Sequence, residues 1–423
     1  MAAILFFSFI ILIFLGVPVA FSLGLSSLFY LILADIPLSI IPQKMFGGLN
    51  SFVLLCIPGF ILAGNLMNAG GITDRIIQFA NNCFGHIRGG LGLANVGSSM
   101  GFAGISGTAL ADTASIGAIL IPAMKKEGYG AGFSAAVTAS SSTVGPIIPP
   151  SLPMIIVGTL ASVSIGDLFL AGALPGILLG LGLMIPTYII SVKRNYPKGE
   201  RKSLKEIWKS FTGAFWALFM TVIIMYGILG GYFTPTEASV IAVLYAFVIG
   251  IFVYKELPIK KIPEIMLSSM TGTASIMLLV GFANLFGWIM VSEQIPQMVA
   301  DAILGISSNP IVVILLINLL LLFVGTFMET IAALVILFPV LLPVAASIGM
   351  DPVQFGVMMV LNLVIGLVTP PVGVCLFVAS QIGKISIGKT AKELLPFLGV
   401  SLAVLMLVAF VPQISLFLPS LFE

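Results

Sequence analysis

The chain has 423 residues, of which 59 % are hydrophobic and 8 % are charged, and its formal net charge at pH 7 is +2. Soluble domains carry about 25 % charged residues, so this composition, with a mean hydropathy of +1.20, excludes a soluble globular protein. Because backbone groups in lipid must find their hydrogen bonds within the protein, the sequence predicts an all-α polytopic membrane protein.

The N-terminal apolar segments differ in length. Ala3–Leu33 is too long for a single crossing of about 20 residues, and the Gly16–Pro18 turn divides it into two short helices. Phe52–Met67 is then predicted to cross once. The amphipathic stretch Ile72–Phe84 follows, and we expect an interfacial helix along the membrane surface, although a plain connecting helix fits equally well.

The stretch Gly89–Ala123 has basic residues at both ends, with Arg88 before it and Lys125 and Lys126 after it. By the positive-inside rule, both ends are cytoplasmic. The stretch is long enough to enter the membrane and turn back at the polar kink Ser106–Thr108. We therefore predict a re-entrant hairpin; an ordinary pair of crossings with a glycine-rich bend is the alternative.

The next apolar stretch, Ala131–Ala161, is interrupted at Ser140–Pro150. Proline lacks an N–H and clashes with the preceding turn, so this stretch cannot be one continuous helix. Unwound backbone at membrane depth is tolerated only where it is buried in protein or lines a cavity. Its free carbonyls and hydroxyls suit a small alkali cation, and exposed half-helix N-termini suit a carboxylate. A proline kink that serves packing alone is the alternative.

A central polar stretch, Lys193–Lys209, holds seven of the 18 basic residues. The positive-inside rule makes this linker cytoplasmic. Counting apolar segments outward from it leaves Lys44 as the one basic residue outside, and it predicts that both termini are periplasmic. The chain then divides into a first repeat (residues 1–192), a cytoplasmic basic linker (193–213) and a second repeat (214–423).

The second half repeats features of the first in the same order, about 220 residues later. Gly59-Phe60, Gly145 and Ser164–Gly166 return as Gly281-Phe282, Gly366 and Ser386–Gly388. A second hairpin is predicted over Pro310–Ala345 with its kink at Gly325-Thr326, and Asn362–Pro371 repeats the proline interruption. Asp301 and Asp351 flank this hairpin without any Lys or Arg, so both its ends face outside. Hairpins that enter from opposite faces indicate inverted-topology repeats.

Two acidic residues, Asp112 and Glu329, lie in the hairpins at what the sequence indicates are matching positions. Intramembrane carboxylates are costly and are functional hypotheses by default. Each is a candidate cation or proton ligand, or a cap on the second helix of its hairpin. No Arg or Lys is predicted near mid-membrane, so an anionic substrate would depend on helix dipoles, hydroxyls and co-bound cations.

The segment Gly383–Thr390 matches the phosphate-binding pattern GxxxxGK[ST]. That pattern requires a buried strand before it and an α/β domain around it, whereas a membrane helix is predicted to precede it here. We therefore expect no phosphate-binding loop, and no set of residues in the chain points to an enzyme.

Several runs of residues resemble the large membrane subunit of tripartite ATP-independent periplasmic (TRAP) transporters. They are Gly101–Gly117, Ile121–Tyr129, Ile148–Ser151 and Thr369–Gly373, and the resemblance covers essentially the whole chain. It implies a multi-pass importer of the bacterial inner membrane that is coupled to Na⁺. The implied substrates are sialic acid, C4-dicarboxylates or related organic acids, carried by an elevator motion of the hairpins and broken helices.

The same resemblance implies two protein partners. They are a small membrane subunit, expected as a separate chain, and a periplasmic substrate-binding protein. The other expected partners are the organic acid anion and membrane lipid, with no nucleic acid. The alternative interpretation keeps the fold but describes a stand-alone ion-coupled carboxylate carrier that needs no binding protein.

Each hairpin kink, paired with its interrupted helix, is an expected sodium site, because neutral oxygens in a tight shell suit this ion. The first site is expected at Ser106, Gly107, Gly145 and Pro146, and the second at Gly325, Thr326, Gly366 and Thr369. The candidate ligands of the organic acid are Thr108, Asp112, Ser142 and Glu329.

Overall fold

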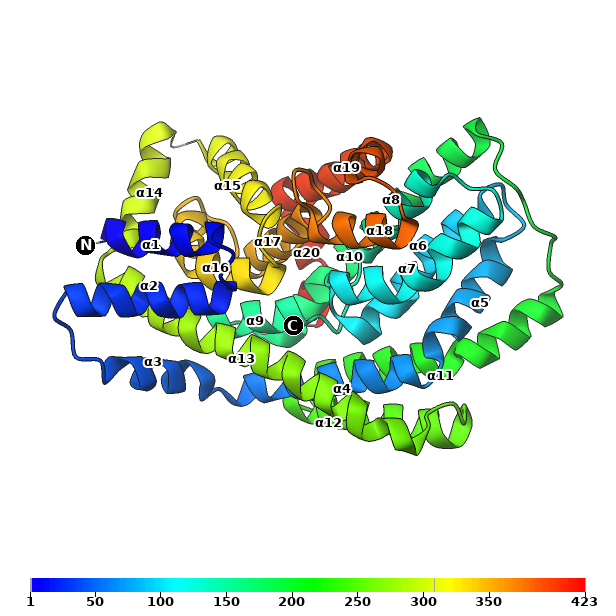
Figure 1. Cartoon of the computed structure of the whole chain (residues 1–423), viewed down its shortest axis with the longest axis horizontal. Coiled ribbons are helices and arrows are strands. Elements are labelled where there is room, and N and C mark those ends of the chain that lie inside the picture. Colours follow the sequence, from blue (N-terminus) through cyan, green and yellow to red (C-terminus); the bar gives the residue numbers. More distant parts are fainter. Residues whose placement is uncertain (1, 308, 423) are drawn as a thin grey trace.

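The computed structural model describes residues 2–307 and 309–422, and all regular secondary structure in these ranges is helical (Figure 1). Seven of the described helices are long and apolar enough to cross a membrane. The α-helices are α1 (Ala2–Phe14), α2 (Val19–Leu33), α3 (Ile40–Leu49), α4 (Cys56–Ala69), α5 (Ile72–Phe84), α6 (Gly90–Ser106), α7 (Ala109–Lys126), α8 (Ala131–Ser142), α9 (Leu152–Ala161), α10 (Ile165–Lys193), α11 (Leu204–Leu229), α12 (Pro235–Val248), α13 (Ile262–Ser292), α14 (Ile295–Ile306), α15 (Pro310–Gly325), α16 (Thr330–Ser347), α17 (Pro352–Gly366), α18 (Val374–Gly383), α19 (Ile387–Phe410), α20 (Pro412–Leu416) and α21 (Pro419–Phe422). The predicted fold class, an all-α polytopic membrane protein, is confirmed.

Two helix pairs turn back at the predicted kinks. α6 ends at Ser106, Gly107 turns the chain with a left-handed φ of +63°, and α7 begins at Ala109. α15 ends at Gly325 and α16 begins at Thr330. In Figure 1, α6 and α7 approach the middle of the molecule from the right, and α15 and α16 from the left. These are the predicted re-entrant hairpins of two inverted repeats.

Two further helices are interrupted, as the prolines predict. α8 and α9 are separated by the irregular residues 143–151, and α17 and α18 by residues 367–373. The peptide bonds Pro149–Pro150 and Pro370–Pro371 are both cis. Each interruption therefore contains one cis proline pair.

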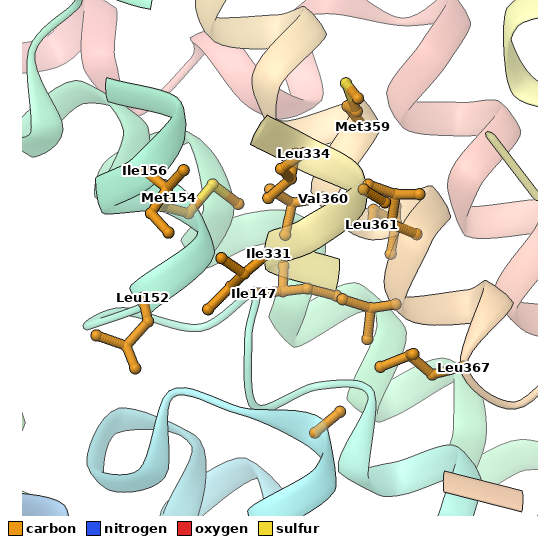
Figure 2. Packing of buried hydrophobic residues seen from close by; sticks show 14 of the residues in the cluster. Ile147, Leu152, Met154, Ile156, Ile331, Leu334, Met359, Val360, Leu361 and Leu367 are labelled. Atoms are coloured by element: carbon orange, nitrogen blue, oxygen red, sulfur yellow. The ribbon is translucent and has the colours of Figure 1, made fainter. Parts of the chain in front are cut away.

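The two halves interlock. α9 of the first half packs against α16 and α17 of the second, and α18 of the second half packs against α7 and α8 of the first. Figure 2 shows buried side chains of α9 (Met154, Ile156), α16 (Ile331, Leu334) and α17 (Val360) gathered in the first of these interfaces. Lipid is as apolar as these side chains, so close packing holds the helices together. We call α6–α10 with α15–α19 the hairpin unit.

A second group of helices lies beside the hairpin unit. α13 packs against α2, α3 and α4, and α12 packs along α4; we call these five helices the scaffold. α5 packs against α6 of the hairpin unit and against α11, whereas α14 packs mainly against α16. These two helices occupy equivalent places in the two halves, directly before each hairpin, and α5 coincides with the predicted amphipathic stretch.

Segments that the positive-inside rule places in the cytoplasm lie together. The Lys125 ammonium donates to the Gly383 carbonyl at 2.8 Å. Arg194, which follows α10, pairs with Glu393 of α19 at 2.8 Å. The ends of α7, α10 and α18 and the start of α19 therefore lie at one face, as the predicted topology requires.

The predicted basic linker is helical at its C-terminal end. α10 extends to Lys193, and α11 begins at Leu204, so residues 204–213 are helical. A capping box starts α11: the Ser203 N–H donates to the Glu206 carboxylate at 2.9 Å, and the Glu206 N–H donates to the Ser203 hydroxyl at 3.3 Å. This pair satisfies N–H groups that a helix start otherwise leaves free. The division into repeats at residues 192 and 213 stays a prediction.

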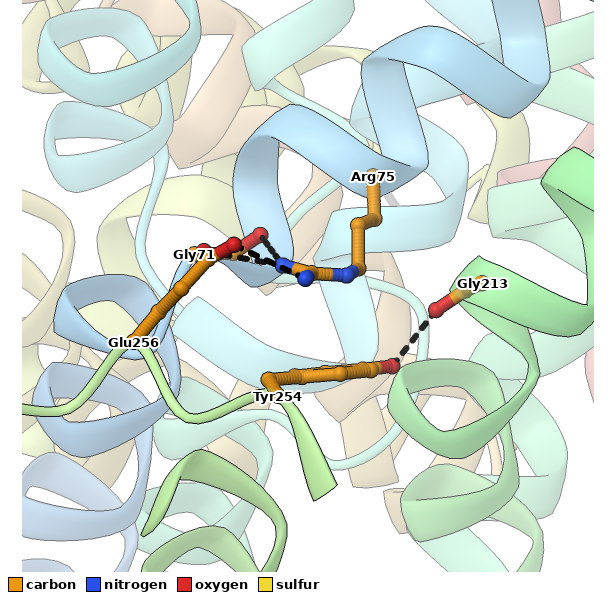
Figure 3. Close-up of polar contacts among 5 residues, drawn as sticks. All are labelled: Gly71, Arg75, Gly213, Tyr254 and Glu256. Carbon is orange, nitrogen blue, oxygen red and sulfur yellow. Dashed lines mark hydrogen bonds and ion pairs between the residues drawn. The ribbon is translucent and has the colours of Figure 1, made fainter. Parts of the chain in front are cut away.

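A polar cluster ties α5 to the loop between α12 and α13 (Figure 3). Arg75 donates to the two Glu256 carboxylate oxygens at 2.9 and 2.8 Å, and its guanidinium carbon lies 4.0 Å from the centre of the Tyr254 ring. The Tyr254 hydroxyl donates to the Gly213 carbonyl at 2.7 Å. The Arg75 guanidinium lowers the pKa of the Glu256 carboxyl. Because the pair is partly exposed, it contributes about 1 kcal/mol or less to stability.

Candidate functional site

The two hairpin tips line one cavity of 310 Å³. Thr108 of the first tip and Glu329 of the second both face it, together with Pro146 from the first interruption. The scaffold contributes Ser275 and Ile276 of α13. The cavity therefore lies between the hairpin unit and the scaffold. None of its described lining residues is Lys or Arg, which agrees with the charge distribution predicted from the sequence.

A second cavity of 190 Å³ adjoins the first and shares Thr108 and Ile276 with it. Its polar lining comes from Asn65 and Asn68 of α4 and from Ser106 and Ser115 of the first hairpin, among others. The Asn68 amide donates to the Ser115 hydroxyl at 3.4 Å. This hydrogen bond joins the scaffold to the hairpin unit.

The Asp112 carboxylate is sealed behind the first tip. Its side chain is 0 % exposed, and neither of its oxygens has a hydrogen-bond partner among the described residues. A Cβ added to Gly145 would overlap Asp112 Oδ2, so the carboxylate lies directly against the unwound backbone. The Ser106 side chain lies beside it. A buried carboxylate without a partner is strongly unfavourable, so this arrangement fits a bound cation.

The four residues expected at the first sodium site all lie around this tip. Ser106 lines the 190 Å³ cavity and Pro146 the 310 Å³ cavity. The Pro146 carbonyl accepts a hydrogen bond from the Ser151 hydroxyl. Gly107 forms the turn itself, and Gly145 lies against the carboxylate described above.

The four residues expected at the second sodium site are also brought together. A Cβ added to Gly366 would lie 2.6 Å from the Gly325 Cα, so the hairpin tip meets the end of α17 backbone to backbone. The Gly373 N–H donates to the Thr326 carbonyl at 3.1 Å, and a Cβ on Gly373 would lie 3.1 Å from the Thr369 carbonyl oxygen. The second tip and the second interruption therefore pack directly against each other, and the Thr326 and Thr369 carbonyl oxygens both lie next to Gly373.

The caps of the hairpins correct one expectation. Thr108 is the N-cap of α7, and Glu329 is the N-cap of α16, where its carboxylate accepts from two backbone N–H groups at 2.9 and 3.3 Å. Asp112 lies inside the first turn of α7. The prediction that Asp112 and Glu329 match was therefore wrong, because the second tip is longer than the first and Glu329 takes the place of Thr108. Of the two roles considered, Glu329 is the cap and Asp112 is not.

The remaining candidate ligand of the organic acid, Ser142, is fully buried and lines neither cavity. Its hydroxyl donates to the Thr138 carbonyl one turn earlier in α8, at 2.8 Å. Thr108 and Glu329, in contrast, both line the 310 Å³ cavity. The structure therefore brings two of the four candidates to that cavity.

Three buried asparagines hold the hairpins against their interrupted helices, and the sequence analysis gave none of them this role. Asn95 of α6 donates to the Thr138 hydroxyl at 2.7 Å. In the second half, Asn362 of α17 donates to Asn318 Oδ1 of α15 at 2.7 Å. Buried amides act as polar glue between apolar helices. Asn95 of α6 and Asn318 of α15 lie at similar places in the first helix of each hairpin, and this recurrence was the available signal.

Comparison with known proteins agrees with the family resemblance seen in the sequence. Residues 6–414 match the family model of the tripartite ATP-independent periplasmic transporter, DctM component. The chain belongs to the DctM family. It is 46 % identical over 412 residues to the sialic acid TRAP transporter large permease protein SiaM of Vibrio cholerae, an alignment that covers 97 % of this chain and 96 % of that protein.

A second relative in the DctM family is named for C4-dicarboxylates instead of sialic acid. The chain is 40 % identical over 400 residues to the C4-dicarboxylate TRAP transporter large permease protein DctM of Pseudomonas aeruginosa, with 94 % of each covered. Among solved structures, the YdaH transporter of Alcanivorax borkumensis superposes with a TM-score of 0.62 at 15 % identity, over 88 % of each chain. That likeness shows the fold alone. The predicted TRAP large membrane subunit is confirmed as the family of this chain.

Proposed function

We propose that this DctM-family chain imports an organic acid anion of the sialic acid or C4-dicarboxylate class, coupled to Na⁺. The anion is delivered by a periplasmic binding protein, and a small membrane subunit completes the transporter. The observation that carries the proposal is the 310 Å³ cavity to which both hairpin tips contribute. Small-molecule sites typically fall between about 300 and 1,000 Å³, so the cavity suits a compact metabolite.

The first hairpin supports the sodium coupling. In its ionised form Asp112 would bring a negative charge to this site, where its oxygens lack a hydrogen-bond partner among the described residues and have the Ser106 side chain as a neighbour. The unwound backbone near Gly145 adds neutral oxygens. Na⁺ at this place would balance the carboxylate. The second tip offers a neutral oxygen from Thr326, and the second interruption offers one from Thr369. We infer that both ions are cargo, with the charged ligand at the first site.

The lining of the cavity bears on the substrate. Glu329 places a carboxylate there, and two like unit charges about 4 Å apart repel by on the order of 4 kcal/mol at an effective dielectric of about 20. A second carboxylate on the substrate is therefore disfavoured near this residue. Hydroxyl and amide donors are favoured instead, with the Thr108 and Thr330 side chains as further partners. This ranks a monocarboxylate rich in hydroxyls, such as sialic acid, above a C4-dicarboxylate.

The division of the fold supports an elevator motion. The hairpins and interrupted helices interlock into one unit, while α2, α3, α4, α12 and α13 pack among themselves. The cavity lies at the boundary between the two groups, where Asn68 and Ser115 form a polar contact. We propose that the hairpin unit carries ion and substrate across the membrane against the scaffold, with α5 and α14 as connecting arms.

Reconstitution tests this function. Proteoliposomes holding the chain with the small subunit are supplied with the binding protein, labelled sialic acid or succinate, and an inward gradient of Na⁺ or K⁺. We expect uptake with Na⁺ and the binding protein present, and little uptake when either is omitted. Strong uptake by the chain alone would establish a stand-alone carrier, and equal uptake with K⁺ would refute sodium coupling.

A further inference from the structure

A third cavity continues the path from the hairpin tips to the surface. Its volume is 330 Å³, and it shares Asn65 and Asn68 with the 190 Å³ cavity. The 190 Å³ cavity in turn shares Thr108 and Ile276 with the cavity between the tips. The three cavities are therefore consecutive, and the third is lined in part by Lys261, which directly precedes α13.

The path is lined by polar groups with unused hydrogen-bonding capacity. The Asn65 amide donates to the Ser269 hydroxyl at 2.8 Å, and the Asn68 amide donates to Ser115 at 3.4 Å. A primary amide has two N–H donors, so one N–H of each asparagine stays available. Both asparagines line the 190 Å³ cavity and the 330 Å³ cavity. Their donors therefore lie between the 310 Å³ cavity at the hairpin tips and Lys261.

Lys261 is the one basic residue among the described linings of the three cavities. Its side chain is exposed, and it forms no ion pair among the described residues. The first turn of α13, whose N-terminus carries positive partial charge, lines the same cavity through Glu264 and Ile265. The positive-inside rule assigns this end of the path to the cytoplasm.

We propose that the third cavity is a release vestibule, a weak binding site for the carboxylate of the transported anion. Lys261 provides the charge, and the free N–H groups of Asn65 and Asn68 lead to it. This inference rests on the proposed import of an organic anion. The deep cavity has no basic side chain, so an anion leaving it gains attraction toward Lys261 on the way out. The negative charge of Glu264, which lines the same cavity, offsets the attraction of Lys261 for the anion. The affinity of the vestibule therefore stays low, and the anion can leave.

Thiol labelling tests the vestibule without any knowledge of the substrate. Ser268 lines the third cavity and lies two helical turns after Lys261 on the same face. The Ser268→Cys variant is made in a Cys83→Ser background and labelled from the cytoplasmic side of the intact complex. Two methanethiosulfonates of similar size are used, an anionic one with a sulfonate and a cationic one with a trimethylammonium group. The ratio of their labelling rates reports the electrostatic potential at residue 268. The ratio of anionic to cationic labelling should fall roughly threefold or more on adding Lys261→Gln, as expected for the loss of one nearby charge.

The adjacent Lys260 does not line the cavity, so Lys260→Gln is the matched control and should leave the ratio nearly unchanged. An unchanged ratio in Lys261→Gln, or an equal fall in both variants, would overturn the proposal. In proteoliposomes, Lys261→Gln should also raise the internal substrate concentration needed for exchange while the external half-saturation stays the same. A complex that transports no organic acid would refute the proposed function, whereas a normal transporter with an unchanged labelling ratio refutes the vestibule alone.

Discussion

Gly366 at the end of α17 has no room for a side chain, which makes it the sharpest probe of the proposed second sodium site. A Cβ at this position would lie 2.6 Å from both the Cα and the carbonyl carbon of Gly325. Carbon atoms in good contact are about 3.5 to 4.0 Å apart, so Gly366→Ala must push the hairpin tip and the interrupted helix apart by about 1 Å. Both neighbours are backbone, so no flexible side chain can absorb the shift.

Overpacking of this kind costs about 1 to 3 kcal/mol, which corresponds to roughly a 5- to 150-fold change in an equilibrium constant. Since the displaced atoms border Thr326 and Thr369, we expect the sodium concentration for half-maximal uptake to rise by a factor in that range. Gly366→Val, with a larger branched side chain, should have a stronger effect.

Sodium-dependent uptake by the reconstituted complex measures this effect, and the shift of the thermal unfolding midpoint with Na⁺ supplies a readout independent of transport. Gly399→Ala in α19 is the matched control, because a Cβ there meets nothing within 4 Å, and it should behave as the unaltered protein. An unchanged sodium dependence in Gly366→Ala, with normal expression, would show that no ion binds between this hairpin tip and α17.

Three other substitutions probe separate parts of the account. Thr369→Ala removes a hydroxyl at the second site without disturbing the prolines, and it should raise the sodium requirement while expression and assembly stay normal. Asp112→Asn removes an unpaired buried charge, so the variant should unfold at a higher temperature than the unaltered protein without Na⁺ and at a lower one in high Na⁺; destabilisation at every sodium concentration would indicate a purely structural role. Because Arg75 lowers the pKa of Glu256, their pair stabilises the protein above the ordinary Glu pKa, and this contribution is lost as pH falls through the lowered value. Glu256→Gln should therefore be less stable by about 1 kcal/mol or less at neutral pH and equal at acid pH, and an equal difference at both would contradict the assignment.

The hairpins and interrupted helices were predictable because their signals are local. Proline breaks a helix wherever it lies, and Gly107 supplies the left-handed turn that ends α6. Basic residues such as Lys125 and Arg88 report the side of the membrane one segment at a time. Each of these features acts within a few residues, so the sequence shows it without knowledge of the fold.

The parts that were missed depend on contacts between distant segments. The interlocking of α9 with α16 and the meeting of Asn68 with Ser115 arise when helices from different parts of the chain pack together. The match of Glu329 with Thr108 was hidden because four residues separate the helices of the second hairpin and only two those of the first, so the caps fall at a different offset from the flanking motifs. The sealing of Asp112 behind Gly145 likewise follows from the packing of α7 on α8.

The central claim is that the hairpin unit moves against the scaffold while it carries the substrate, and cross-linking tests it most directly. Asn68 of α4 and Ser115 of α7 form the polar contact between the two groups, whereas Arg194 and Glu393 pair within the hairpin unit at 2.8 Å. Each pair is changed to cysteines in a Cys83→Ser background and joined with a short reducible thiol cross-linker in the reconstituted complex. We predict that joining residues 68 and 115 stops sodium-driven uptake until the link is reduced, while joining residues 194 and 393 leaves uptake intact. Full uptake with residues 68 and 115 completely cross-linked would contradict the account.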